Sequence, residues 1–176
     1  MNILHKNPVR KNALVVFSLA VGLLFFNPLY ADVTAQLKTV GKGDLSWFLM
    51  DIYQASLHSA DGVYADKKYP QALKIRYQRS FKKQWLVDAT AKEWQKMAIT
   101  RQQYNPWLRQ LSTLWPDVKS GDTITFFVAE NGQGSFYHND ILLGEVENPD
   151  LADAFLDIWL AKNTSQPRLR RQLIGE

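Results

Sequence analysis

The sequence predicts an α+β domain in which a mostly antiparallel β-sheet carries helices layered on one face. Three observations predict this class: two-residue alternation in the N-terminal part of the chain, a change to helical spacing near residue 83, and a return to short strands after Gly121. Helical segments also close the chain. Separate runs of strands and helices are typical of α+β proteins rather than of parallel α/β sheets.

The N-terminal strands are predicted from alternation and from β-branched and aromatic residues. Residues 33–40 alternate briefly, and residues 45–57 are rich in apolar side chains. The Gly-Lys-Gly sequence between them predicts a turn, so we expect these two segments to form a hairpin. Residues 72–79 alternate cleanly between apolar and basic or polar side chains, which predicts a strand that is buried on one face.

Two helices are expected next. Within residues 83–99, apolar residues at positions 87, 91, 94 and 98 recur at helical spacing, and polar residues recur on the opposite face. Asn105 and Pro106 are typical of a helix N-terminus, and Pro116 is expected to end the helix that follows.

The C-terminal part predicts three strands and two helices. The Asn131-Gly132 dipeptide is a strong hairpin signal between residues 122–130 and 134–138, and a further turn leads to residues 141–146. An Asn-Pro-Asp cap then opens a helix with an apolar stripe over residues 151–159. Pro167 opens a last short helix.

Residues 1–31 have the features of a secretory signal peptide. Three basic and no acidic residues precede an apolar or small stretch at 13–26, and Leu-Tyr-Ala ends the segment. We expect cleavage after Ala31 and a mature domain of residues 32–176 in a bacterial periplasm. The alternative is an uncleaved anchor, but a 14-residue helix spans only about 21 Å, short of the roughly 30 Å hydrocarbon core.

Composition excludes several classes of function. Three of the 21 basic residues lie in residues 1–31, so 18 remain against 17 acidic ones, and no nucleic-acid partner is expected. The chain has no cysteine, no glycine-rich nucleotide-binding motif and no Gly-x-Ser-x-Gly sequence. His58 and His138 are too few and too far apart for a metal site. We therefore expect no cofactor and no metal.

An ordered set of short motifs resembles a known family. The motifs are WPDVKSGD at 115–122, GQG at 132–134, LGEV at 143–146, IWL at 158–160, PRLR at 167–170 and LIG at 173–175, together with YQASL at 53–57 and LKIRY at 73–77. In this order and spacing they resemble the exported bacterial branch of the chalcone isomerase-like family. The resemblance implies a large antiparallel sheet, helices layered on it, and a ligand cleft between the two.

The resemblance does not carry the family's catalytic residues into this chain. The family's threonine position falls on Phe48, and no arginine occurs between Asp32 and Ile75, where Lys38 and Lys42 are the cations. The helix at 83–99 contains neither the tyrosine nor the asparagine of plant enzymes, and the nearest candidates, Tyr104 and Asn105, are expected in a turn beyond it. A non-catalytic protein is therefore expected.

Some members of the family bind fatty acids in the same cleft. By resemblance, the side chains expected to line the cleft or to contact the ligand are Phe48, Met50, Tyr53, Arg76, Trp94 and Met97. Soft and aromatic walls suit an acyl chain. The alternative for each apolar residue is an ordinary place in the core.

Charged residues offer further candidates. Arg76 and Arg79 are predicted to hold an anionic head group or to lie on a solvated strand face. A basic cluster near the C-terminus is predicted either to contact anionic lipid or to complement a helix end. The members of this cluster are Lys162, Arg168, Arg170 and Arg171. Asp51 is a candidate base if it is buried, and otherwise points outward.

These observations predict a periplasmic, non-catalytic protein that binds an apolar or amphipathic small molecule such as a fatty acid or lipid. Two alternatives stay open. The first is an isomerase or lyase that uses Asp51 or Tyr53 for proton transfer on an unknown substrate in the same cleft. The second is an interaction protein of the envelope whose cleft is filled by its own side chains.

Overall fold

The computed structural model describes residues 32–47, 50–146 and 148–176, and it confirms the predicted α+β class. Six antiparallel strands form one sheet whose spatial order follows the chain order, so every strand pairs with its sequence neighbour. The strands are β1 (Lys38–Trp47), β2 (Met50–Ser59), β3 (Gln71–Tyr77), β4 (Thr123–Val128), β5 (Gly134–His138) and β6 (Ile141–Val146).

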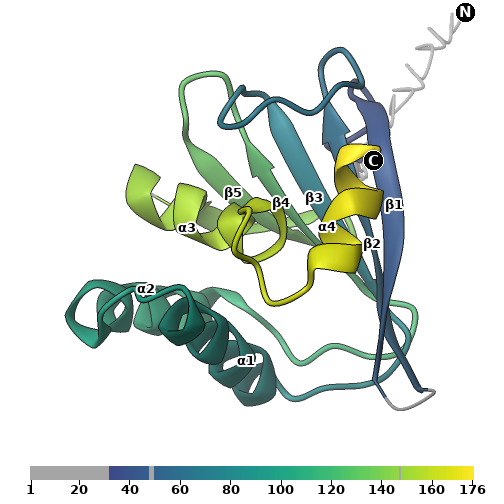
Figure 1. Cartoon of the computed structure of the whole chain (residues 1–176). Coiled ribbons are helices and arrows are strands. Elements are labelled where there is room, and N and C mark those ends of the chain that lie inside the picture. Colours follow the sequence, from purple (N-terminus) through teal and green to yellow (C-terminus); the bar gives the residue numbers. More distant parts are fainter. Residues whose placement is uncertain (1–31, 48–49, 147) are drawn as a thin grey trace, which may run out of the picture.

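Four helices lie on one side of this sheet (Figure 1). They are α1 (Lys83–Lys96), α2 (Arg101–Leu114), α3 (Pro149–Leu160) and α4 (Pro167–Ile174). The α1–α2 pair connects β3 to β4, whereas α3 and α4 follow the last strand. Helix α4 lies along β1, and the inward faces of the strands form the core with the apolar stripe of α3.

The first hairpin differs from the prediction. Asp32 accepts hydrogen bonds from the backbone N–H and hydroxyl of Thr34, which closes a turn, so the strand begins at Lys38 rather than at residue 33. The expected glycine turn lies inside β1. A Cβ at Gly41 would approach the carbonyl oxygen of Gln172 to 2.1 Å, so the missing side chain admits α4 rather than a turn.

Helix α2 also begins earlier than predicted. Thr100 accepts a hydrogen bond from the backbone N–H of Gln103, whose side chain in turn accepts one from the Thr100 N–H, and this capping box starts the helix at Arg101. Pro106 therefore lies inside the helix, and Tyr104 and Asn105 belong to it rather than to a turn. Tyr104 is buried and accepts a hydrogen bond from Gln95 at 2.7 Å.

Candidate ligand-binding cleft

A cavity of about 570 Å³ separates α1 from the inner face of the sheet. Strands β1 to β4 supply its floor, α1 its roof, and α3 together with the end of α2 its back wall. Its apolar floor and back wall comprise Leu45, Ile52, Ile75, Ile124, Phe155 and Ile158, with Tyr53, Tyr77, Trp115 and Trp159 among them. Cavities of this size and composition are typical of small-molecule sites.

A β-bulge shapes the floor of the cavity. Leu45 pairs with Tyr53, and Ser46 pairs with Asp51, so Ile52 is the extra residue on β2. Such a bulge locally re-aims side chains, which accounts for Ile52 and Tyr53 both lining the cavity although they are consecutive in a strand. Bulges of this kind are common beside functional sites.

Aromatic residues follow one another around the cavity. Ring centroids lie 5.8 Å apart for Trp115 and Phe155 and 5.2 Å apart for Phe155 and Trp159. The indole N–H of Trp159 donates to the hydroxyl of Tyr53 at 2.8 Å, and the ring of Tyr53 meets that of Tyr77 edge-on at 6.3 Å. These contacts hold the rings in edge-to-face geometry along the apolar wall.

At the mouth of the cavity, α1 presents a mixed stripe. Trp85 is 47% exposed and stacks on Phe81 with a centroid distance of 4.3 Å. Asp88, Lys92 and Lys96 follow along the same helix, and all three are exposed. The mouth is therefore polar and charged, whereas the interior is apolar, as an amphipathic ligand requires.

Glu93 joins α1 to the loop before α4. Its carboxylate accepts hydrogen bonds from Lys96 at 2.7 Å and from Ser165 at 2.6 Å. These contacts close the side of the cleft toward α4. Burial raises the pKa of Tyr53, and the negative charge of Glu93 adds to this rise, while the hydrogen bond from Trp159 opposes it.

The structure places the predicted ligand residues as follows. Tyr53 lines the cavity. Trp94 does not, because it is fully buried between helices, where its indole N–H donates to the carbonyl oxygen of Ala154 at 2.8 Å. Met97 ends α1 and packs against the same core. Phe48 lies outside the described residues.

Two further predicted residues lie away from the cavity. Met50 is 38% exposed at the start of β2. Arg76 is exposed on the outer face of the sheet, because its neighbours Ile75 and Tyr77 point into the cavity and side chains alternate along a strand. Asp51 is also exposed, where it accepts a hydrogen bond from Ser46 at 2.8 Å, so the buried base that we considered is not formed.

The face of α1 that the sequence predicted to line the cleft is not the face that lines it. The stripe at 87, 91 and 94 packs in the helical layer, whereas the cavity is lined by the neighbouring stripe that contains Trp85, Ala89 and Lys92. A tryptophan within an otherwise polar stripe was the available signal. Trp115 and Tyr77 were also missed, because only the fold brings the end of α2 next to β3.

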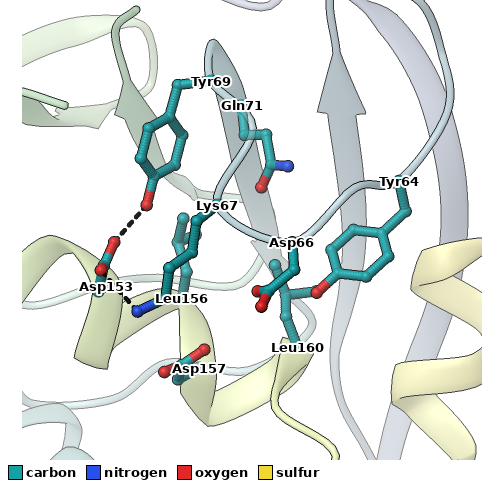
Figure 2. A pocket seen from close by; sticks show the side chains of 9 residues that line it. All are labelled: Tyr64, Asp66, Lys67, Tyr69, Gln71, Asp153, Leu156, Asp157 and Leu160. Atoms are coloured by element: carbon teal, nitrogen blue, oxygen red, sulfur yellow. Dashed lines mark hydrogen bonds and ion pairs between the residues drawn. The ribbon is translucent and has the colours of Figure 1, made fainter. Parts of the chain in front are cut away.

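A second, small depression lies on a different face of α3, beside the segment that leads into β3 (Figure 2). Asp153 accepts a hydrogen bond from Tyr69 and pairs with Lys67 at 2.8 Å. The depression has room for about one water molecule, with a volume near 10 Å³. It is too small for an organic ligand, so the cleft under α1 is the candidate site.

The basic cluster near the C-terminus is partly used within the fold. The guanidinium of Arg170 donates to the carbonyl oxygen of Leu160 at 2.7 Å, which satisfies the end of α3. Lys162, Arg168 and Arg171 are exposed. Among the residues that the structure describes, no helix is long and apolar enough to cross a membrane.

Comparison with known proteins identifies the class. Residues 31–175 match the chalcone isomerase-like family, and the chain belongs to this family, as its motifs predicted. An uncharacterized protein of Haemophilus influenzae is 25% identical over 142 residues, which cover 81% of this chain and 70% of that protein. The Arabidopsis thaliana fatty-acid binding protein AtFAP1 has the same fold, with a TM-score of 0.65 and 12% identity over 82% of this chain and 89% of that one.

Proposed function

We propose that this protein is a non-catalytic binding protein that holds an apolar or amphipathic small molecule, such as a fatty acid or another lipid, in the cleft under α1. The observation that carries the proposal is the cavity of about 570 Å³ with apolar floor and back wall and a charged mouth. The shared fold with a fatty-acid binding protein supports the same class of ligand.

Burial of the ligand's apolar part would supply most of the binding free energy, at about 0.8 kcal/mol for each CH₂ group removed from water. Lys92 and Lys96 lie at the mouth and are suited to attract an anionic head group that stays near solvent. Lys96 is paired with Glu93, so Lys92 is the more available of the two. This division places the polar end outward and the chain inward.

We propose that the cleft binds its ligand without catalysis, and the residues that line it support this part of the proposal. The described residues that line it include no arginine, and Lys38 and Lys42 are not among them. A lysine cannot in any case reproduce the bidentate fork of an arginine. Asp51, the carboxylate considered as a base, is exposed outside the cavity. We therefore propose binding rather than isomerisation.

Export and membrane contact are further parts of the proposal. The features of residues 1–31 favour secretion to a bacterial periplasm with cleavage after Ala31. The exposed cations Lys162, Arg168 and Arg171 are suited to a peripheral contact with anionic lipid. Cell fractionation tests the first part. Sedimentation with anionic and neutral vesicles, with and without substitution of these three cations, tests the second.

Binding is tested with a variant whose new side chain fills the cleft. Ala89 is half-buried on α1 and lines the cavity, so Ala89→Trp places a large ring in the space for the ligand. Gln84→Trp, on the exposed side of the same helix, is the matched control. Thermal unfolding is measured with a panel of fatty acids on protein expressed from the full-length sequence.

We expect fatty acids to stabilise the unchanged protein and the Gln84→Trp variant, by about 2.7 kcal/mol at a ligand concentration a hundred times the dissociation constant. Ala89→Trp should fold and show no such stabilisation. Equal responses of both variants would contradict binding in this cleft. A lack of response by all three proteins would favour an interaction protein without a ligand.

A further inference from the structure

Two large apolar side chains are exposed at one end of the molecule. Trp85, near the start of α1, is 47% exposed, and Met50, at the start of β2, is 38% exposed. Figure 1 shows that the start of α1 and the adjoining ends of β1 and β2 lie at this end. The backbone N–H of Gln78 donates to the carbonyl oxygen of Ile52 at 2.9 Å, which ties the segment after β3 to β2. Apolar side chains left in water beside charged ones are typical of an interaction surface.

The connection from β3 to α1 supplies positive charge at the same end. Residues 79–85 read Arg-Ser-Phe-Lys-Lys-Gln-Trp and include no acidic residue. Lys82 pairs with Asp117 at 2.7 Å, whereas the ammonium of Lys83 donates to a neutral backbone oxygen at 3.1 Å. Arg79 is exposed and forms no ion pair with a described residue. The charges of Arg79 and Lys83 are therefore available to an anionic partner.

This end also borders the mouth of the cleft. Trp85 and Ser46 are both exposed and both line the cavity, so part of the mouth lies between the start of α1 and the end of β1. Trp85 stacks on Phe81, whose ring meets that of Tyr77 edge-on at 6.1 Å. The indole is thereby held at the rim, although about half of it is in water. A ligand that enters or leaves the cleft here passes the ring of Trp85.

The partner that fits this end is a lipid bilayer with anionic head groups. Tryptophan is enriched where membranes meet water, because its ring is apolar and its N–H is polar. Lysine and arginine beside such a ring attract anionic lipid. An apolar ligand is concentrated in bilayers rather than in water, so a mouth set against the bilayer shortens its path. A nucleic acid would require a longer basic surface than these few cations provide.

We propose that this end of the molecule docks on an anionic lipid bilayer, with the mouth of the cleft facing the membrane. Trp85 and Met50 then lie at the level of the head groups. Arg79 and Lys83 contact the lipid phosphates. This inference rests on the proposed function, because it names the surface from which the ligand of the same cleft is loaded. It differs from the contact proposed for the cations near the C-terminus, because the exposed large apolar residues of the described chain include none on α4.

The first test is sedimentation with phosphatidylcholine vesicles, with and without phosphatidylglycerol. Compared with the unchanged protein, Arg79→Gln/Lys83→Gln should bind the anionic vesicles about tenfold more weakly, since a cation near an anionic surface contributes up to about fivefold. Lys38→Gln/Lys68→Gln is the matched control, because both lysines are exposed at the opposite end of the sheet. All proteins are expressed from the full-length sequence and share residues 1–31, so a difference between them arises in the domain.

The apolar part of the surface is tested with Trp85→Ala. Binding to anionic vesicles should weaken by about tenfold, because the exposed part of the ring no longer leaves water on docking. Val63→Ala is the control, since Val63 is 63% exposed and lies in the connection from β2 to β3, at the opposite end. Equal effects of the two substitutions would overturn the inference.

The second test reports which end touches the bilayer. The chain has no cysteine, so a single one can be introduced at either end of β2 and labelled with a polarity-sensitive dye. Met50→Cys lies at the docking end, and Val63→Cys lies beyond the other end of this strand. Anionic vesicles should shift the emission of the dye to shorter wavelength in Met50→Cys and leave it unchanged in Val63→Cys.

Ligand binding is measured separately from docking. Thermal unfolding with dissolved fatty acids and no vesicles should give the same stabilisation for Arg79→Gln/Lys83→Gln as for the unchanged protein, because neither residue lines the cavity. A response to fatty acids without binding to anionic vesicles overturns the inference and leaves the proposed function intact. Vesicle binding without any response to fatty acids contradicts the proposed function and keeps the docking surface.

Contact through another surface gives distinct results. Vesicle binding that is lost on substitution of Lys162, Arg168 and Arg171, but not in Arg79→Gln/Lys83→Gln, assigns the contact to the C-terminal cations and overturns the inference. An emission shift at both labelled positions also overturns it. Binding of a single-stranded oligonucleotide in place of vesicles would assign the basic segment to nucleic acid instead.

Discussion

The two ends of the same sheet face are covered in different ways. Beneath α3, the rings of Phe126, Phe136 and Phe155 pack with centroid distances of 4.4 to 5.0 Å, and all three are buried. Beneath α1, the same face borders a cavity of about 570 Å³. Both ends have apolar residues, so hydrophobicity alone does not separate a core from a binding site.

At the open end, α1 is held by apolar packing against other helices and by two polar contacts. Trp94 and Glu93 attach α1 to α3 and to the loop before α4, through the carbonyl of Ala154 and the hydroxyl of Ser165. The helix is thereby fixed at its C-terminal part and stands away from the strands. The cavity under α1 remains open because this helix is anchored to other helices instead of to the sheet.

The largest effect on stability is expected at the packed end. Phe136→Ala should lower the free energy of unfolding by about 4 kcal/mol, because it leaves a cavity among closely packed rings. Trp85→Ala, at the mouth of the cleft, should change it by less than about 0.5 kcal/mol, since this side chain is 47% exposed. Urea denaturation measures both, and similar losses would remove the distinction between the two ends.

A substitution at the contact of α4 with β1 should lower the free energy of unfolding by nearly as much. In Gly41→Ala, the new Cβ would meet the backbone oxygens of Gln172 and Leu173 at 2.1 and 2.6 Å, and backbone cannot move aside cheaply. We expect a loss of about 2 to 3 kcal/mol. Lys42→Ala is the control, because Lys42 is exposed on the same strand. If Gly41→Ala has the stability of this control, α4 does not pack as described.

Acid should remove a stabilising contribution of Asp122. Asp122 is the last residue before β4, and hydrogen bonds from Asn139 and from the N–H of Lys119 lower its pKa to about 2. A carboxylate with a lowered folded-state pKa stabilises the protein above about pH 4, and this contribution disappears as the pH falls toward 2.

Asp122→Asn should therefore cost about 1 to 2 kcal/mol at pH 7, after allowance for partial exposure, and less than that near pH 2. Free energies of unfolding measured across this range check the sign. Asp61 and Asp117 also have lowered pKa values. The difference in the free energy of unfolding between the unchanged protein and Asp122→Asn, taken at each pH, isolates the contribution of Asp122. A constant difference at all pH values would contradict the assignment.

A smaller loss than at Phe136 or Gly41 is expected for the hydrogen bond inside the cleft wall. Trp159→Phe removes the donor to Tyr53, and we expect a loss of about 1 kcal/mol. A double-mutant cycle with Tyr53→Phe, followed by thermal unfolding, isolates the coupling between the two side chains. A coupling energy near zero would show that the ring contacts alone position Tyr53.

Local patterns predicted most of the elements because hydrophobic periodicity reports which face of an element is buried. The apolar stripe of α3, with Leu151, Phe155 and Ile158 on one side, is buried as expected. The glycine turn was misplaced because Gly41 and Gly43 are required by a helix more than a hundred residues away. Such a contact leaves the same local signal as a turn.

The candidate site was less predictable than the fold. Helix α1 carries one stripe that packs against other helices and another that roofs the cavity, and only the tertiary arrangement decides between them. Trp94 was expected in the cleft for this reason, although it is sealed in the helical layer. Tyr53, which belongs to the family motif, lines the cavity because it pairs with Tyr77 on β3 and regular alternation places both on the inner face.

The most direct test of the central claim is native mass spectrometry with organic extraction. The unchanged protein and the Ala89→Trp variant are each recovered without detergent from cells that express the full-length sequence. We expect one molecule of an apolar compound bound to each molecule of the unchanged protein, and no such compound bound to Ala89→Trp. Empty unchanged protein that no member of the fatty-acid panel stabilises would contradict the account.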